Sequence, residues 1–571
     1  ATGLVYSLLH LWGFDVSVND MKNFRQSGSK TPGHPEYGHT HGIEITTGPL
    51  GQGIANAVGF AMAGKYAQNL LGKDVINHKV YCLCGDGDLQ EGISYEATAT
   101  AGHLKLDNLV IIYDSNSITI EGDTSIAWSE NVKKRFQAID FEVIEIDGHN
   151  FDQIDKAFVQ AKNSTMPVLI IAKTVIAKGA VTLEGSHHSH GAPLGVDEIK
   201  QAKIKAGFNP DVDFEVSADV KGAFDKLIIG STMQNSWNES LSKETKAKIS
   251  ELQNPDFDSI VYPTFEAGSS VATRDSNHKI LNAIASKIPS FLGGSADLAP
   301  SNKTELKDMG DFPNGRNIHF GIKEHAMAAI ANAMNLYGLF RVYSATFFVF
   351  SDYLKPSARI AALAGIPQHF IWTHDSIGVG EDGPTHQPIE HLSQFRALPN
   401  FYTFRPADAT ENVEAWKIAL KMNAPTTFVC SRQGLKVLKD DKAFGDVCNG
   451  GYLLTKRENA TITIMASGSE VNLALQTACA LEKEGILANI VSVPCFDLLL
   501  EQSEDYINKI IDPKTRVYAV EAARALEYYK YADVVFGMDS FGASGPADKL
   551  FDEFGFTVDK LKTKIIEDLK K

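Results

Sequence analysis

The sequence has little of what marks membrane, nucleic-acid-binding or secreted proteins. Its 571 residues include only six cysteines, and acidic side chains outnumber basic ones to give a net charge of −16. That charge argues against nucleic acid or an anionic membrane as a partner. No apolar run is long enough to cross a membrane. The first ten residues lack the basic start and cleavage site of a signal peptide. These absences favour a cytoplasmic protein.

The cysteines show no spacing typical of a metal site or a disulfide framework. Only Cys82 and Cys84 are close in sequence, and they alternate along an apolar segment. We therefore expect buried, reduced thiols in a reducing compartment.

The chain is too long for one hydrophobic core, so it should form two to four domains. Up to about residue 230, apolar strand patterns alternate with helical ones, which predicts a parallel sheet. The expected strands are Val80–Cys84, Leu109–Tyr113, Phe141–Ile146 and Val168–Lys173. A polar stretch with three prolines, from about 210 to 265, is typical of a linker.

Two further α/β units follow the linker. In the second unit we expect a short strand running into a turn over 291–298, a strand running into a helix over 317–327, and strands at Val342–Phe350 and His369–Thr373. In the third we expect strands at Thr461–Ala466, Ala488–Val493 and Arg516–Val520, with a packing or interface role. The predicted fold class is α/β, with three domains and mostly parallel sheets. The predicted boundaries are 1–235, a linker at 236–265, 266–442 and 443–571.

The most informative stretch is 79–116. A strand runs into Gly85-Asp86-Gly87, Asp88 begins a helix, and a second strand ends at Asp114-Ser115-Asn116. In a parallel sheet both strand ends lie at the carboxyl edge, where ligands bind. Asp86 and Asn116 would supply hard oxygen ligands for a magnesium ion that bridges a diphosphate, and the glycines would let the backbone approach the phosphates. An ordinary strand–turn–helix is the alternative. The spacing resembles the thiamine diphosphate signature.

Four other stretches concentrate polar or small residues. His34 lies in a rigid turn, and 46–53 leads into a helix of small residues that suits either a buried position or a subunit interface. Three histidines in 185–191 could form a metal tract, a loop contacting phosphate or sugar, or a mobile surface loop. The glycine-rich loop 374–387 carries two histidines and three acids, a composition typical of a binding loop.

Together these motifs resemble the transketolase family, in the right order and over nearly the whole chain. The motifs are Gly48–Gly53, Gly85–Gly92, Gly294–Leu298, Gly321–Met327, His374–Gln387 and Phe541–Gly545. The 374–387 loop is the most specific of them. The resemblance implies a thiamine diphosphate-binding fold whose domains are diphosphate-binding (1–235), pyrimidine-binding (266–442) and C-terminal (443–571). It also implies a homodimer with thiamine diphosphate and active sites at the interface.

The resemblance assigns cofactor contacts residue by residue. Asp86, Asn116 and the carbonyl of Ile118 would hold one divalent cation, magnesium or calcium. Gly87 and His190 would contact the diphosphate. Glu324 of the opposite chain would share a proton with a pyrimidine nitrogen. The other implied cofactor-binding residues are Gly48, Pro49, Leu50, Gly85, Ile176, Asp297, Phe347, Phe350 and Tyr353.

The resemblance also assigns sugar phosphate contacts. Arg274, Ser301, His386 and Arg432 would bind the substrate phosphate, for which guanidinium groups are suited. His34, His190 and His374 would act with Glu324 as catalytic groups, since imidazoles exchange protons near neutral pH. Asp382 would contact a sugar hydroxyl. The implied activity moves a two-carbon ketol unit from a ketose phosphate to an aldose phosphate in the non-oxidative pentose phosphate pathway.

One departure from the family pattern leaves alternatives open. Family members carry a Gly-His just before residues like Ala1-Thr2-Gly3, and another histidine upstream. We expect that a segment with these histidines is truncated, disordered or cleaved. Deoxyxylulose-phosphate synthase and dihydroxyacetone synthase are the nearest enzymatic alternatives, and the 374–387 loop favours a sugar donor over pyruvate. A catalytically weak scaffold that keeps the fold for dimerisation is the non-enzymatic alternative, against which the retained Asp86, Asn116 and Glu324 argue.

Overall fold

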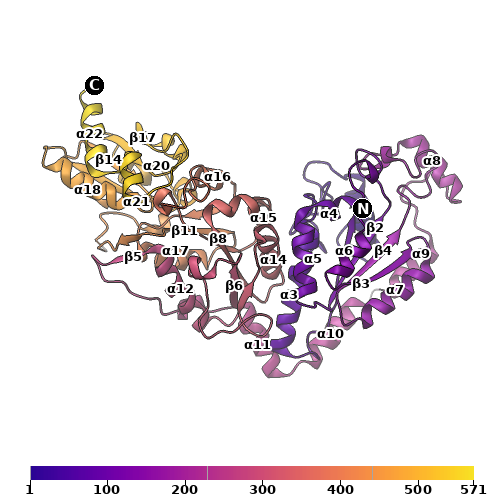
Figure 1. The fold of residues 1–571 in the computed structure, drawn as a ribbon. Coiled ribbons are helices and arrows are strands. Elements are labelled where there is room, and N and C mark those ends of the chain that lie inside the picture. Colours follow the sequence, from indigo (N-terminus) through magenta and orange to yellow (C-terminus); the bar gives the residue numbers. More distant parts are fainter. Residues whose placement is uncertain (1, 228, 440) are drawn as a thin grey trace. The chain divides into compact units, whose positions relative to one another are not determined.

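The computed structural model describes residues 2–227, 229–439 and 441–571, drawn in Figure 1 from indigo at the N-terminus to yellow at the C-terminus. The chain divides into two compact units. Unit 1 is Ala1–Ser250 with Leu336–Gly338, and unit 2 is Glu251–Asn335 with Leu339–Lys571. The boundary at residue 250 lies inside the stretch predicted as a linker.

Unit 1 is built on a parallel sheet. Its described residues form four strands in the spatial order β1-β2-β4-β3. They are β1 (Val80–Gly85), β2 (Leu109–Ser115), β3 (Glu142–Asp147) and β4 (Val168–Lys173). The helices are α1 (Thr2–Leu11), α2 (Val18–Lys22), α3 (Gln52–Leu71), α4 (Asp86–Gln90), α5 (Gly92–His103), α6 (Val132–Ala138), α7 (Phe151–Asn163), α8 (Val196–Lys205), α9 (Ala218–Leu227), α10 (Gly230–Ser240) and α11 (Lys243–Gln253), the last crossing the unit boundary.

Helix α3 shows why small residues matter in unit 1. Its face of Ala, Gly and Asn is buried within the chain itself, and it packs on α5 and β1. Small side chains let helix backbones approach closely. This burial agrees with the first of the two explanations left open by the sequence, and a role of α3 in a subunit interface stays a prediction.

Unit 2 contains two mostly parallel sheets and a separate two-stranded antiparallel sheet. The larger sheet, order β10-β11-β9-β8-β6-β7 within the described residues, is parallel throughout. Its strands are β6 (Phe291–Ser295), β7 (Asn317–His319), β8 (Arg341–Phe347), β9 (His369–Thr373), β10 (Tyr402–Phe404) and β11 (Thr426–Cys430). Strands β5 (Ser270–Ala272) and β12 (Gly434–Lys436) form the antiparallel pair. The accompanying helices are α12 (Thr273–Lys287), α13 (Ala299–Asn302), α14 (Glu324–Leu336), α15 (Ser351–Ala364), α16 (His391–Arg396) and α17 (Ala409–Ala419).

The C-terminal sheet of unit 2 has the order β13-β15-β14-β16-β17, with only β13 antiparallel among its described strands. Its strands are β13 (Tyr452–Thr455), β14 (Ile462–Ala466), β15 (Ala488–Ser492), β16 (Arg516–Val520) and β17 (Val534–Phe536). Its helices are α18 (Glu470–Glu482), α19 (Phe496–Leu500), α20 (Glu504–Ile510), α21 (Ala547–Glu553) and α22 (Val558–Leu569). Helices α18 and α22 pack on each other, and α18 also packs on β14 and β15.

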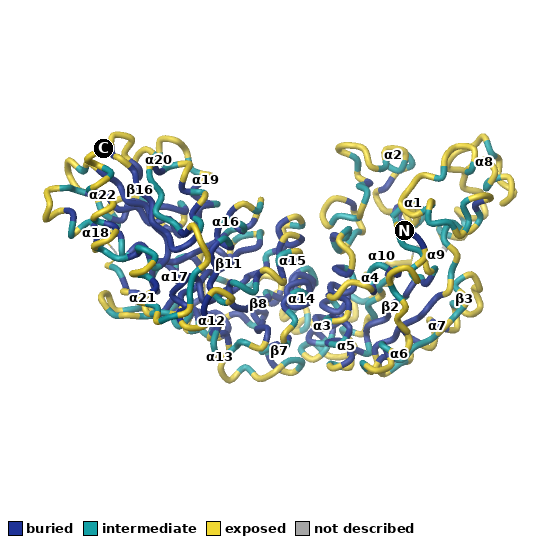
Figure 2. The backbone as a smooth tube through the Cα atoms, turned by 45° about the horizontal axis from the view of Figure 1, so that its top comes forward, coloured by how far each residue is buried: buried dark blue, intermediate teal, exposed yellow. Residues whose placement is uncertain are grey.

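The buried residues are concentrated in the strands of the sheets. Figure 2 shows the central strands β8, β11 and β16 in dark blue and the connecting segments largely in yellow. In the larger sheet of unit 2, Trp416 of α17 stacks on Phe428 of β11 with ring centroids 4.0 Å apart. Buried apolar side chains of this kind hold the strands whose ends carry the site residues.

The predicted class of parallel α/β sheets is confirmed, but several boundaries and the cysteine prediction were wrong in part. The strand expected to reach Phe350 ends at Phe347, and a 3₁₀ turn (Phe348–Phe350) leads into α15. An unbroken aromatic run cannot separate a buried strand from a buried turn. Helix α4 begins at Asp86 rather than Asp88. All six cysteines are free, as expected, but Cys448 and Cys479 are exposed.

In the described part of the chain, none of the helices combines the length and the apolar character that a bilayer crossing requires.

Candidate active site

The ends of β1 and β2 bring Asp86 to an edge of the unit 1 sheet. Gly85 pairs in register with Asp114, and the Tyr113 hydroxyl donates to Asp86 Oδ1 at 2.6 Å. Asp86 Oδ2 is buried and has no hydrogen-bond partner among the described residues. Burial raises the pKa of Asp86. Hydrogen bonds from the Tyr113 hydroxyl and from the backbone N–H groups of Asn116 and Ser117 act in the opposite direction and lower it in part. A buried carboxylate oxygen without a partner is costly, and a bound cation would satisfy it.

The residues after β2 add oxygen ligands beside Asp86. Ser117 adopts a left-handed conformation with φ of 61°, and the Ile118 N–H donates to Asn116 Oδ1 at 3.0 Å. This turn presents Asn116 and Ile118 next to the neighbouring strand end. Carboxylate, amide and backbone carbonyl oxygens are the donor set that magnesium and calcium accept. The residues present therefore fit a hard divalent cation.

Asp88 joins two glycine-rich segments that are distant in sequence. Its Oδ1 accepts from the Gly51 N–H at 3.0 Å, and its Oδ2 accepts from the Gly85 N–H at 2.9 Å. One carboxylate thus fixes the 46–53 segment against the turn that carries Asp86. Sequence reasoning missed this role, although the second acid of Gly-Asp-Gly-Asp was visible.

Glycines let three predicted cofactor segments meet in unit 1. A side chain at Gly87 would approach Leu50 to 2.9 Å, so the 46–53 segment lies directly on the turn. Gly48 has φ of 139°, and a side chain there would lie 3.4 Å from His34. The structure therefore brings His34, Gly48, Pro49, Leu50 and Gly87 into one neighbourhood.

Ile176 and His190 lie on the long connection after β4. The Gly185 N–H donates to the Ile176 carbonyl at 2.9 Å, which closes this connection into a loop. His190 is exposed, and in the described residues its ring forms no hydrogen bond with the turn at Asp86. The rings of His187 and His188 stack on each other at 4.1 Å. The structure gathers no carboxylate or cysteine with these histidines into a metal-binding group within the described residues.

In unit 2, Glu324 is the first residue of α14 and is only 7% exposed. The Thr346 hydroxyl of β8 donates to Glu324 Oε1 at 3.3 Å. Beyond the end of β8, Phe347 and Phe350 stack nearly parallel with centroids 5.8 Å apart, and Tyr353 lies 6.1 Å from Phe350. The predicted carboxylate therefore comes from α14, and the predicted aromatic wall comes from the end of β8, the turn that follows it and the first turn of α15.

His374 lies against this wall at the end of β9. Its ring centroid is 3.8 Å from that of Phe347, and its φ of 67° places its backbone in the left-handed region. The Thr373 hydroxyl donates to Asn302 Oδ1 at 2.7 Å, so its oxygen accepts from His374 Nδ1 at 2.7 Å. This pairing leaves Nε2 as the acceptor nitrogen. Burial and nearby Arg274 and Arg432 lower the pKa of His374 to about 3.

The predicted phosphate-binding residues gather around His374. Arg274 Nη1 donates to the Ser301 carbonyl at 3.0 Å, and burial lowers the pKa of Arg274, as does the charge of Arg432. The His386 ring lies 5.3 Å from Phe350 and its Nδ1 contacts the Thr385 hydroxyl at 2.9 Å. Two guanidinium groups close enough to repel each other suit a shared anion.

Two predicted site residues of unit 2 lie outside this group around His374. Asp382 is exposed on the 374–387 loop, and Asp297 is exposed after β6. Asp297 has φ of 59°, a conformation that side chains other than glycine adopt at an energetic cost and that concentrates at functional sites.

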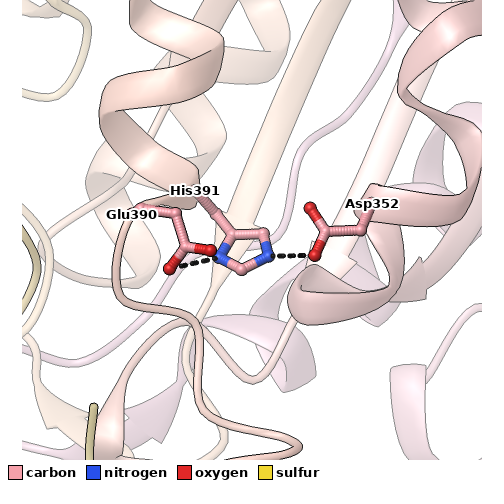
Figure 3. A group of neighbouring side chains, drawn as sticks. All are labelled: Asp352, Glu390 and His391. Atoms are coloured by element: carbon pink, nitrogen blue, oxygen red, sulfur yellow. Dashed lines mark ion pairs between the residues drawn. The ribbon is translucent and has the colours of Figure 1, made fainter.

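A group that sequence reasoning missed lies behind the aromatic wall. His391, the first residue of α16, is buried between two carboxylates, with Nε2 3.2 Å from Asp352 Oδ2 and Nδ1 3.8 Å from Glu390 Oε2. Figure 3 shows one carboxylate at each ring nitrogen. Because the nitrogens point in opposite directions, one cation could not take both nitrogens and both acids. The group instead ties α16 to the first turn of α15, next to Phe350 and Tyr353.

Comparisons with known proteins agree over the whole chain. Family profiles match the transketolase thiamine diphosphate binding domain at residues 1–258, the transketolase pyrimidine binding domain at 269–437 and the transketolase-like C-terminal domain at 450–557. The transketolase of Halalkalibacterium halodurans is 46% identical over 97% of this chain and 87% of its own length. That of Bacillus subtilis is 44% identical over 99% of this chain and 89% of its own.

Solved structures give the same result. The structure of transketolase from Campylobacter jejuni has a TM-score of 0.97 and 59% identity, covering 99% of this chain and 89% of that one. A Pichia stipitis transketolase in complex with sedoheptulose 7-phosphate has a TM-score of 0.94 and 38% identity, covering 99% and 87%. The chain therefore belongs to the transketolase family, the thiamine diphosphate-dependent enzymes that transfer a two-carbon ketol unit from a ketose phosphate to an aldose phosphate.

Proposed function

We propose that the turn at Asp86 holds the diphosphate of thiamine diphosphate through one divalent cation, magnesium or calcium. Asp86, Asn116 and the Ile118 carbonyl would bind the cation. The observation that carries this proposal is the buried Asp86 Oδ2, which has no hydrogen-bond partner among the described residues. Gly85, Gly87, Ile176 and His190 would border the diphosphate.

At the other end of the cofactor, Glu324 of the opposite chain of the dimer would hold the aminopyrimidine ring and carry a proton at its carboxyl group. Gly48, Pro49, Leu50, Phe347, Phe350, Tyr353 and Asp297 would complete the cofactor site. When bound, thiamine diphosphate supplies the nucleophilic carbon and the electron sink for the two-carbon unit. The chain's own contribution is to orient that group, exclude water from it and move protons around it.

His374 is suited to receive a proton from a sugar hydroxyl. Because its pKa is lowered to about 3, the ring is neutral at pH 7, and its Nε2 is the acceptor nitrogen. His34 and His190 would act on other hydroxyl protons, and Asp382 would accept a hydrogen bond from the sugar.

Sugar phosphates would bind with their phosphate at Arg274, Ser301, Arg432 and His386. The chain as a whole carries a charge of −16, so an anionic substrate needs such a local cationic cluster. Related enzymes were crystallised with xylulose 5-phosphate and sedoheptulose 7-phosphate, and these are the substrate class expected here.

We further propose a cytoplasmic homodimer whose active sites lie at the subunit interface, with diphosphate-binding, pyrimidine-binding and C-terminal domains at 1–235, 266–442 and 443–571. The sheets of four, six and five strands in the described residues, one in each proposed domain, support this division. The six free cysteines accord with a reducing compartment.

Calorimetric titration of thiamine diphosphate, with and without magnesium, tests the cation site. The unaltered chain should bind the cofactor far more tightly with magnesium, and Asp86→Asn should remove most of that difference. Asp155→Asn, at an exposed position of α7 in the same unit, is the matched control. Equal magnesium dependence in Asp86→Asn and the unaltered chain would overturn the proposed cation site.

A further inference from the structure

The C-terminal sheet of unit 2 reaches the substrate loop through one buried guanidinium group. Arg405 follows β10 and its side chain is fully buried. On one side, its Nη2 and Nε donate to Asp375 Oδ2 at 2.8 and 3.2 Å. On the other side, its Nη1 donates to Glu470 Oε2 at 2.5 Å and to Glu521 Oε1 at 3.3 Å. Asp375 belongs to the 374–387 loop, whereas Glu470 and Glu521 follow strands of the C-terminal sheet.

A second arginine fixes the other end of the same loop to the same carboxylate. Arg396 of α16, the helix that follows the loop, donates from Nη1 and Nη2 to the two oxygens of Glu521 at 2.7 and 3.0 Å. Ser467 also donates to Glu521, and Glu527 pairs with Arg396. The loop therefore runs between two arginines that share Glu521.

The middle of the loop also rests on the C-terminal part of the chain. Gln387 Nε2 donates to the carbonyls of Gly380 and Ala543, both at 2.9 Å. A side chain at Gly383 would lie 2.1 Å from Ser544 Oγ, so the loop lies in direct contact with 541–545.

The residue next to the anchored Asp375 is His374, which is buried and held at φ of 67°. A residue other than glycine keeps such a conformation only when its surroundings determine it. The hydrogen bonds between Arg405 and Asp375 restrain the backbone next to His374. The hydrogen bond with the Thr373 hydroxyl restrains the His374 ring.

We propose that Arg405 is a positioning residue for ketol transfer: by joining Asp375 to Glu470 and Glu521, it lets the C-terminal sheet hold His374 and the 374–387 loop in the orientation that substrate requires. The inference rests on the role proposed above for His374. It gives the C-terminal sheet, which carries few candidate catalytic groups, a part in the reaction. The planar guanidinium group of Arg405 suits this position because its Nε and Nη2 face one oxygen of Asp375 while its Nη1 faces the carboxylates of Glu470 and Glu521.

The test uses Arg405→Lys, which keeps the charge but cannot span the three carboxylates. Hydrogen exchange of the purified protein with thiamine diphosphate and magnesium, followed by mass spectrometry, should show exchange at 376–387 at least about tenfold faster, with α3 of unit 1 unchanged. The kcat/KM for xylulose 5-phosphate should fall about 10- to 100-fold, while magnesium-dependent cofactor binding stays within about twofold.

Two further variants keep the test decisive. Glu470→Gln is isosteric, leaves the fork to Asp375 intact, and should give the same pattern at smaller amplitude even if Arg405→Lys does not fold. Arg516→Lys is the control, since Arg516 pairs with Asp568 at the opposite end of β16 from Glu521, and it should change neither quantity.

Unchanged exchange in the loop of Arg405→Lys and Glu470→Gln would overturn the inference. So would an equal loss in Arg516→Lys, because that would show only a general weakening of the C-terminal sheet. A loosened loop with unchanged kcat/KM would remove His374 from the reaction and overturn the positioning role, while leaving the cation site at Asp86 intact.

Discussion

The two loops that carry most of the candidate site are held in place in different ways. The turn at Asp86 in unit 1 is fixed by nearby backbone groups, by Tyr113 of the adjacent strand and by Asp88, which bridges Gly51 and Gly85. The 374–387 loop in unit 2 is fixed by Arg405, Arg396 and 541–545, which are distant in sequence. The turn at Asp86 can be recognised from its own Gly-Asp-Gly motif, although Asp88 ties it to Gly51, 37 residues away. Nothing in the sequence marks the arginines that support the second loop, so that support becomes visible only in three dimensions.

The comparison predicts that changes in unit 2 affect turnover and changes in unit 1 affect cofactor retention. Glu324→Ala should give the largest effect, a loss of ketol transfer of about 10²- to 10⁴-fold, because it removes the carboxyl proposed to position the cofactor ring and carry a proton for it. Steady-state rates measure the loss. Residual cofactor binding should still depend on magnesium. Glu305→Ala, an exposed carboxylate of unit 2, serves as the control; near-normal turnover in Glu324→Ala would contradict the assignment.

Arg432→Lys tests the proposed phosphate-binding residues of unit 2 separately from its proposed catalytic residues. Losing a charge-assisted fork to phosphate should cost about 1.5–3 kcal/mol, which corresponds to a roughly 10- to 100-fold rise in the KM for a ketose phosphate. The KM for an unphosphorylated ketose should hardly change. The two KM values, compared between the variant and the unaltered chain, separate phosphate binding from catalysis. An equal rise for both donors would show that Arg432 acts elsewhere.

Asp88→Asn tests the bridge that the Asp88 carboxylate forms between the backbone N–H groups of Gly51 and Gly85 in unit 1. An amide keeps one acceptor oxygen but turns its NH₂ group towards the other backbone N–H, so one of the two hydrogen bonds to Gly51 and Gly85 is lost. The expected cost is about 1–1.5 kcal/mol, roughly a tenfold weaker affinity for thiamine diphosphate with magnesium. Calorimetry measures it, with kcat at saturating cofactor unchanged. A lower kcat without weaker binding would assign Asp88 to the chemistry instead.

The last prediction concerns the pH dependence of stability rather than activity or cofactor binding. Burial and two arginines lower the pKa of His374 to about 3, below its unfolded value near 6.5. Between these values the unfolded chain binds the extra proton, so this histidine makes the folded state less stable as pH falls, by at most ~1.4 kcal/mol per pH unit. His374→Asn should reduce that slope, measured by urea unfolding between pH 4.5 and 7. An unchanged slope would mean that His374 does not titrate this way.

Much of the fold and part of the site were predictable because their signals are local. Alternating apolar strands and helices predicted the parallel sheets, and Gly85-Asp86-Gly87 with Asn116 predicted candidate oxygen ligands at the ends of β1 and β2, which the structure places side by side. The 374–387 loop was recognised from its own composition. The roles of His374 in this loop and of Phe347 and Arg274 were assigned from family resemblance, and the structure places His374 against Phe347 and close to Arg274.

The remaining features depend on contacts that no local pattern encodes. Arg405 and Asp375 are separated by 30 residues, and Arg405 and Glu521 by 116, so nothing in the sequence pairs them. His391 was not distinguishable from any other histidine at the start of a helix. The end of β8 at Phe347 was also hidden, because the following turn is as aromatic as the strand.

Ketol transfer from xylulose 5-phosphate to ribose 5-phosphate by the unaltered chain tests the central claim most directly. The account predicts turnover that requires both thiamine diphosphate and magnesium or calcium, since in the proposal Asp86, Asn116 and Ile118 would bind the cation and Glu324 and His374 would move protons. Absence of turnover with both present, or turnover that persists when cofactor and metal are removed, would contradict it.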